Sequence, residues 1–247
     1  DDALLIEGHF LRGGLDAQVA ARDHDDVGGM NDGIQIIDGL GLLDLGHQEW
    51  VAAQLATRFG LPIADYALAE VPAELIVPGQ ELDLSQLGAG IVFASRELPH
   101  VQELSVTTRA LVGVEQATDV LVFDWWLHNE DRHLTAFGGN PNLLWDVQTE
   151  QLAVIDHNQA FDPSFNAAHF LESHVFGYCW NRVSTDLVEQ AKYLQKMEVV
   201  LTDLNIVRDS IPGDWWFVDD DVPANVSWDE IVRCLERCRL DDFWTAP

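Results

Sequence analysis

The sequence predicts an α+β fold with two lobes, a small β-rich lobe over residues 1–97 and a larger, mostly helical lobe over residues 98–247. A chain of 247 residues is long enough for two lobes of roughly 100 and 150 residues. Short apolar segments separated by Gly and Asp dominate the first part, whereas segments with a helical period dominate the second. Hydrophobic residues make up 47% of the chain, which is enough for a sizeable core.

The predicted small lobe begins with hairpins, because its apolar pieces are short and Gly and Asp separate them. These pieces lie at residues 3–6, 19–21 and 34–37. A helix is predicted over residues 48–59, where apolar residues recur at helical spacing until Gly60 ends the pattern. Two strands follow, at Tyr66–Val71 and Gly90–Phe93, and residues 94–98 are predicted to connect the lobes.

The predicted larger lobe contains two strands among its helices. Leu143–Trp145 and Leu152–Ile155 are short apolar runs joined by a polar turn, which is typical of a β-hairpin. The remaining apolar residues recur at helical spacing, and the predicted helices cover residues 108–127, 167–176, 183–207 and 229–239.

Three polar motifs lie beside the predicted hairpin: residues 128–133 (His-Asn-Glu-Asp-Arg-His), residues 140–142 (Asn-Pro-Asn) and residues 155–157 (Ile-Asp-His). They supply Asp131, an amide and Asp156 in that order. Phosphoryl transfer uses such a set, with one carboxylate to orient the attacking hydroxyl and an amide plus a second carboxylate to hold Mg²⁺ against the phosphates. The hairpin is expected to bring Asn142 and Asp156 close enough to share one cation.

The same motifs resemble the larger lobe of the HipA-like kinases, relatives of the type II phosphatidylinositol 4-kinases. Further similar segments extend the resemblance over about residues 47–245, namely Glu49-Trp50, Phe59-Gly60-Leu61-Pro62, Phe161-Asp162-Pro163 and His174-Val175-Phe176. The resemblance implies a protein-kinase-like fold. It also implies a phosphotransferase that uses ATP and Mg²⁺ and acts on Ser or Thr of a protein.

The resemblance also implies the roles of individual residues. Asp131 matches the catalytic carboxylate, Asn142 and Asp156 match the metal ligands, and Glu49 is expected to belong to the nucleotide site. The spacing from Asp131 to Asn142 is longer than is usual in the family, which leaves Asn140 open as the amide ligand. From their position in the predicted connection, Ala94 and Arg96 are expected to contact the nucleotide.

One expected residue is missing from the predicted small lobe. A kinase carries a Lys there that neutralises the α- and β-phosphates. Asp38 stands at the matching position, and no Lys occurs before Lys192. A carboxylate repels a triphosphate, so the alternative to an active kinase is a pseudokinase that serves as a binding module. A different metal-dependent enzyme built on the same acidic residues is a third interpretation.

Composition limits the partners. A net charge of −29 disfavours binding to nucleic acid and to an anionic membrane. It indicates either an acidic surface suited to high salt or a docking face for a basic protein partner. Three cysteines cannot form a disulfide framework in a chain of this size, which favours a reducing compartment. With no apolar stretch of transmembrane length and no leader-like segment, we expect a cytoplasmic protein.

Overall fold

A computed structural model describes residues 4–9, 16–22, 34–35, 43–75, 89–136, 138–219, 222–224 and 227–245. The chain divides into two units. The first unit comprises Asp1–His47, Ala64–Pro99 and Pro212–Ala224, and the second comprises Gln48–Ile63, His100–Ile211 and Asn225–Pro247. Each unit is therefore assembled from separate stretches of the chain, and the predicted lobe boundary at residue 97 stays a prediction.

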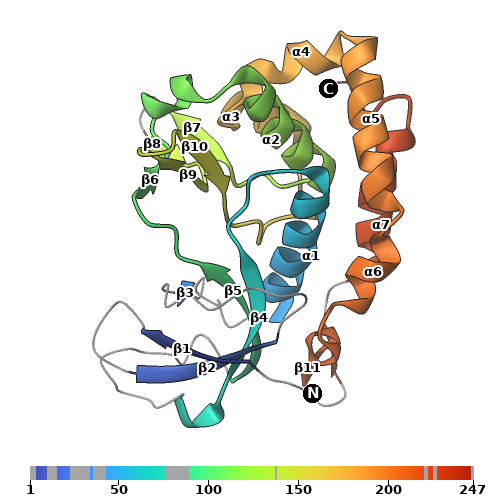
Figure 1. Ribbon diagram of the computed structural model, residues 1–247. Coiled ribbons are helices and arrows are strands. Elements are labelled where there is room, and N and C mark those ends of the chain that lie inside the picture. The colour runs from blue at the N-terminus through green and yellow to red at the C-terminus, as the bar shows by residue number, and fades with distance from the viewer. Residues whose placement is uncertain are drawn as a thin grey trace. The chain divides into compact units, whose positions relative to one another are not determined.

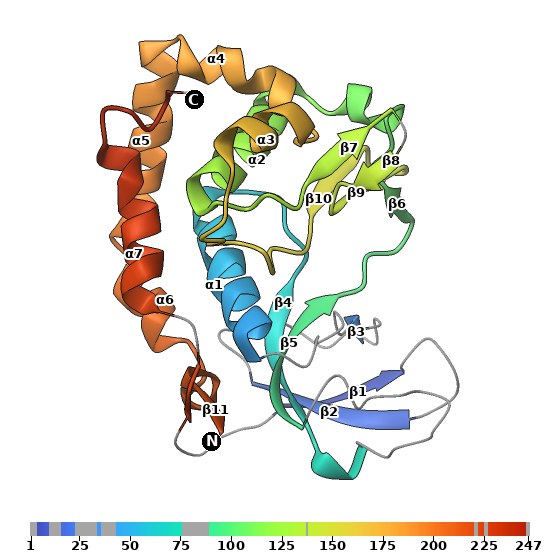
Figure 2. The same cartoon turned by 180° about the vertical axis from the view of Figure 1, so that it is seen from behind.

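The first unit contains an antiparallel five-stranded sheet with the strand order β1-β2-β4-β5-β3 (Figure 1). Its strands are β1 (Leu4–His9), β2 (Asp16–Arg22), β3 (Ile34–Gln35), β4 (Tyr66–Val71) and β5 (Gly90–Arg96). The view from behind shows the β1–β2 hairpin beside β4 and β5 (Figure 2). Ala69 of β4 and Ala94 of β5 are buried together, and Val92 packs against them.

A segment from late in the sequence completes the first unit. The short strands β11 (Phe217–Asp219) and β12 (Val222–Pro223) pair antiparallel. Just before them, the indole nitrogen of Trp215 donates to the Ile91 carbonyl of β5 over 3.0 Å. This hydrogen bond satisfies a buried indole N–H and ties the late segment to the sheet.

The second unit is mostly helical. It contains most of α1 (Leu43–Phe59) and a three-stranded antiparallel sheet in the order β10-β9-β6. The strands of this unit are β6 (Val101–Glu103), β7 (His133–Thr135), β8 (Gly138–Asn140), β9 (Leu143–Asp146) and β10 (Gln151–Val154). Its other helices are α2 (Val114–Leu127), α3 (Ala167–Ser173), α4 (Trp180–Ser184), α5 (Leu187–Leu201), α6 (Leu204–Asp209) and α7 (Trp228–Glu236).

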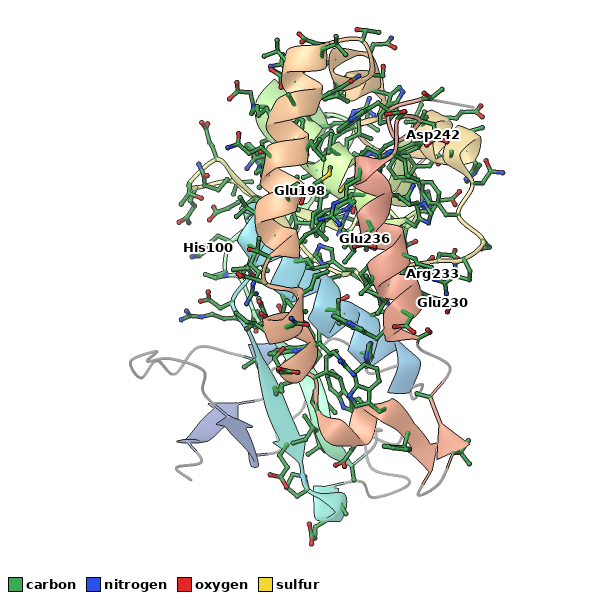
Figure 3. The ribbon with its side chains drawn as sticks, turned by 90° about the vertical axis from the view of Figure 1, so that its right-hand side faces the viewer. His100, Glu198, Glu230, Arg233, Glu236 and Asp242 are labelled. Atoms are coloured by element: carbon green, nitrogen blue, oxygen red, sulfur yellow. The ribbon has the colours of Figure 1, made fainter. Side chains whose placement is uncertain are left out.

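Helix α2 forms the core of the second unit, since every residue from Val120 to Leu127 is buried. Phe123 packs against Phe59 of α1 with 5.2 Å between ring centroids. The indole nitrogen of Trp126 donates to the Leu235 carbonyl of α7 over 2.8 Å. Figure 3 shows α5 and α7 side by side, with Glu198 and Glu236 on neighbouring helices. Arg239 bonds to both carboxylates, so an ionic link joins the ends of these helices.

The α+β prediction is confirmed, and this mixture is compatible with a two-lobed kinase-like fold. The predicted strands at 66–71, 143–145 and 152–155 match β4, β9 and β10 within a residue. The predicted helix over residues 183–207 was wrong in its continuity, because α4, α5 and α6 share that stretch. Residues 94–96 were predicted as a connection but belong to β5 and pair with β4 and β3.

No helix in the described part of the chain combines the length and apolarity that crossing a bilayer requires.

Candidate functional site

The loop that carries Asp131 begins where α2 ends. His128 takes a left-handed conformation with φ 55°, which stops the helix and turns the chain. The Asn129 backbone N–H then donates to the Asp124 carbonyl over 2.9 Å. The Asn129 side chain also donates to the Asp124 carboxylate over 2.8 Å, so this loop is tied twice to the last turns of α2.

The carboxylate of Asp131 is oriented by two amides. Oδ2 accepts hydrogen bonds from the Asn142 side chain over 2.8 Å and from the Asn140 side chain over 3.1 Å. No described residue donates to the other oxygen, Oδ1. The structure therefore brings both candidate amides to the predicted catalytic residue, and it leaves one carboxylate oxygen available to accept a further hydrogen bond.

Arg132 links the three motifs from inside the second unit. The side chain is fully buried, and its Nε bonds to the Asp124 carboxylate. One terminal nitrogen donates to the carbonyls of Asn142 and Ile155, and the other donates to the Asp156 carbonyl over 3.2 Å. One guanidinium thus fixes the backbone at both predicted metal-binding residues, because its planar donors reach several acceptors at once.

A buried carboxylate balances the charge of Arg132. Burial alone would raise the pKa of Asp124, but the Arg132 guanidinium and a hydrogen bond with His174 hold it below its ordinary value. The Nδ1 atom of His174 accepts from the Phe176 backbone N–H over 3.0 Å, so its Nε2 carries the proton that faces Asp124. Burial lowers the pKa of His174. The imidazole is therefore a neutral donor, and the ion pair beside it is between Asp124 and Arg132.

Asp156 lies in a markedly anionic environment. Burial, and then the neighbouring Glu49 carboxylate, raise the pKa of Asp156 above its ordinary value. Glu49 is itself buried in α1 and accepts a hydrogen bond from the His157 backbone N–H. Both Asn142 and Asp156 have left-handed backbones, with φ 47° and 55°. Strain of this kind costs on the order of 1–3 kcal/mol and is concentrated at functional sites.

The residues at this site fit Mg²⁺. Asn142 uses its amide nitrogen on Asp131, which leaves its amide oxygen for a cation. From the described residues, the Asp156 carboxylate accepts a single hydrogen bond, of 3.4 Å from the Asn158 backbone N–H. Both groups supply the oxygen ligands that Mg²⁺ prefers, and Mg²⁺ commonly completes its shell with phosphate and water. Within the described ranges, no group of three or more His, Cys, Asp or Glu could hold a metal by itself.

The predicted nucleotide-binding residues fall into different parts of the chain. Glu49 lies with the site in the second unit and contacts the segment after Asp156. Ala94 and Arg96 lie in β5 of the first unit, where Ala94 is buried and Arg96 forms a 3.1 Å ion pair with Asp65. Their contact with a nucleotide stays a prediction. Asp38 lies outside the described residues.

Sequence reasoning missed Asp124, the contact that His174 makes with it, and the central role of Arg132. One signal was available, because Asp124 is a lone carboxylate within an otherwise apolar helical stretch from Val120 to Leu127. A buried charge needs a partner, so that position predicts a nearby cation. The identity of the cation follows only from the fold, because Arg132 reaches Asp124 by turning back after the helix ends.

Comparison with known proteins identifies the family of the chain. Residues 44–247 match the family model of the HipA-like kinases, and this range includes nearly all of α1, the Asp131 loop and the segments around Asn142 and Asp156. No curated protein gives a significant match. Because the match spans most of the sequence, the chain belongs to the HipA-like kinase family.

Proposed function

We propose that the protein is a phosphotransferase that uses ATP and Mg²⁺ and phosphorylates Ser or Thr of a protein. Family membership supports phosphoryl transfer in general. The observation that carries the finer proposal is the shared anchoring of the site. Asn142 donates to Asp131, while Arg132 holds the backbone carbonyls of Asn142 and Asp156. The hydroxyl-orienting group and the two metal ligands are thus held as one assembly.

In this proposal, Asp131 Oδ1 accepts the proton of the acceptor hydroxyl and aims its oxygen at the γ-phosphorus. Oδ2 cannot serve equally well, because the amides of Asn140 and Asn142 already bond to it. Asn142 would hold the metal through its amide oxygen and Asp156 through its carboxylate. Mg²⁺ would neutralise phosphate charge. The positive charge of the metal would also relieve the repulsion between Asp156 and Glu49.

The negative charge of the chain favours a protein substrate whose phosphorylated segment is basic. Asp and Glu number 42 against 13 Lys and Arg, so an anionic partner is repelled at long range. Substrate residues flanked by Lys or Arg would instead be attracted.

Calorimetric titration of ATP with and without Mg²⁺ tests the proposal. Asp156→Asn should abolish metal-dependent ATP binding, because it removes a charged ligand. Asp131→Asn should retain ATP binding within about threefold yet lose phosphate transfer, because that carboxylate orients the hydroxyl and does not hold the phosphates. Asp242→Asn is the matched control, since Asp242 is an exposed carboxylate near the end of the chain (Figure 3). Unchanged Mg²⁺-ATP affinity in Asp156→Asn would refute the metal assignment.

The second candidate is a pseudokinase, which the absence of any Lys before Lys192 favours. The same titration separates the two candidates when Asp38→Lys is included. A wild-type chain that binds no ATP, together with an Asp38→Lys variant that does, would identify a pseudokinase. Transfer by the wild-type chain would instead require another cation near the phosphates, and Arg12 and Arg22 are the first to replace with Ala.

A further inference from the structure

The long spacing between Asp131 and Asn142 is occupied by a small hairpin. Strands β7 and β8 pair antiparallel, with His133 opposite Asn140. The chain therefore leaves the Asp131 loop, turns, and returns to the same place. Because of this return, Asn140 is brought beside Asp131 although nine positions separate them.

Two glycines make the return possible. Gly138 has φ 109°, a conformation that residues with a side chain rarely adopt. A Cβ at Gly139 would lie 2.3 Å from the His133 carbonyl oxygen, so the facing strand leaves room only for glycine. The hairpin thus fixes the position of the Asn140 backbone, from which the side chain extends toward Asp131.

We infer that Asn140 is a second positioning residue for Asp131, and that the β7–β8 hairpin delivers it. An ionised carboxylate can only accept hydrogen bonds, so the amide nitrogen of Asn140 must face Asp131. Its 3.1 Å bond ends on the same oxygen, Oδ2, that Asn142 contacts. Two donors on one oxygen restrict rotation of the carboxylate and direct Oδ1 toward an acceptor hydroxyl. This inference rests on the proposed phosphotransferase function.

The surroundings of Asn140 argue against two simpler roles. Its side chain is exposed, so it contributes little to the core. A metal ligand would use the amide oxygen, and the oxygen of an exposed amide can bind water instead of a cation. Asn142 differs because it is buried and can serve Asp131 and a cation through its two ends. The sequence left the two amides as alternatives for the metal ligand. In this inference Asn140 positions Asp131, and Asn142 both positions Asp131 and binds the metal.

Substitution by Ala and by Asp tests the inference in the whole 247-residue chain. The rate of γ-phosphate transfer from ATP to a peptide with Ser flanked by Lys and Arg should fall about tenfold in Asn140→Ala, the effect of losing one hydrogen bond to a charged group. The rate should fall further in Asn140→Asp, because a second carboxylate would replace the donor. The Kd for ATP, the Mg²⁺ midpoint and the melting temperature should each stay close to wild type. Asn205→Ala, at an exposed position on α6, is the matched control.

Each other outcome has a definite meaning. A transfer rate within twofold of wild type in Asn140→Ala would overturn the inference and leave the proposed function intact. A raised Mg²⁺ midpoint in Asn140→Ala, restored by Asn140→Asp, would identify a metal ligand and also overturn it. If the wild-type chain transfers no phosphate, or if Asp131→Asn transfers it normally, the proposed function fails and the positioning role fails with it.

Discussion

A single buried side chain, Arg132, determines the geometry of the site. It bonds to Asp124 on one side and to the carbonyls of Asn142, Ile155 and Asp156 on the other. The motif around Asp131, Asn142 and Asp156 could be predicted from the sequence, because each residue type has a known chemical use. The role of Arg132 could not be predicted, since its partners are mostly backbone atoms and any residue could supply those.

Replacing Arg132 by Met should lower the free energy of unfolding by about 3–5 kcal/mol, because Asp124 would be left as an uncompensated buried charge. Arg132→Lys keeps the charge but cannot reach all of these acceptors, so it should also destabilise the fold and weaken transfer. Urea unfolding followed by tryptophan fluorescence measures the free energy of unfolding of both variants.

Arg239→Met is the matched control for Arg132. Arg239 makes two 2.8 Å bonds to Glu198, yet nearly half of its side chain is exposed. The free energy of unfolding of Arg239→Met should fall by less than about 1 kcal/mol, because exposed ion pairs contribute little to stability. Equal losses at the two positions would contradict the central role of Arg132.

At the scale of elements, the sequence predicted some strands within a residue but missed β6, β7 and β8 and the breaks between helices. Strands β9 and β10 were predicted because short apolar runs flank a polar turn. The division between α4 and α5 was missed, although Asp186 signals it. The Asp186 carboxylate accepts from the Val188 and Glu189 backbone N–H groups, as an N-cap does. Apolar periodicity continues across this cap, so it hides the boundary.

The sequence showed only a longer spacing where the β7–β8 hairpin lies, and the glycines of this hairpin allow a test of the whole element. Gly139→Ala should displace β8, because its Cβ would collide with the His133 carbonyl. Phosphate transfer should then fall between about tenfold and a hundredfold, as misplaced catalytic groups do, while ATP affinity stays close to wild type. Gly213→Ala is the control, since a Cβ there meets no described atom within 4 Å. Wild-type transfer by Gly139→Ala would show that the hairpin does not hold Asn140 in place.

At the scale of the whole molecule, the net charge can be counted from the sequence, but the role of that charge cannot be predicted from the sequence. A net charge of −29 follows from counting residues. Whether it serves tolerance of salt or a basic partner depends on where the charges lie. Several acidic side chains of the second unit are already paired, as Glu230 is with Arg233 (Figure 3) and Glu236 is with Arg239. These pairs neutralise a small part of the excess, and repulsion among the remaining carboxylates must weaken the folded state.

Salt should therefore stabilise the protein. Raising the ionic strength from 0.1 M to 1 M shortens the screening length from about 10 Å to about 3 Å, which removes most repulsion between exposed carboxylates. The melting temperature in sodium chloride at pH 7 should rise by several degrees over this range, since 1 kcal/mol shifts it by about 2–4 °C in a chain of this size. At pH 5, closer to the isoelectric point of about 4.2, the carboxylates are partly protonated and the same addition should have a smaller effect. Equal melting temperatures at the two ionic strengths at pH 7 would show that the acidic residues are too well paired or too far apart to repel, and the excess charge would then be better explained by a basic partner.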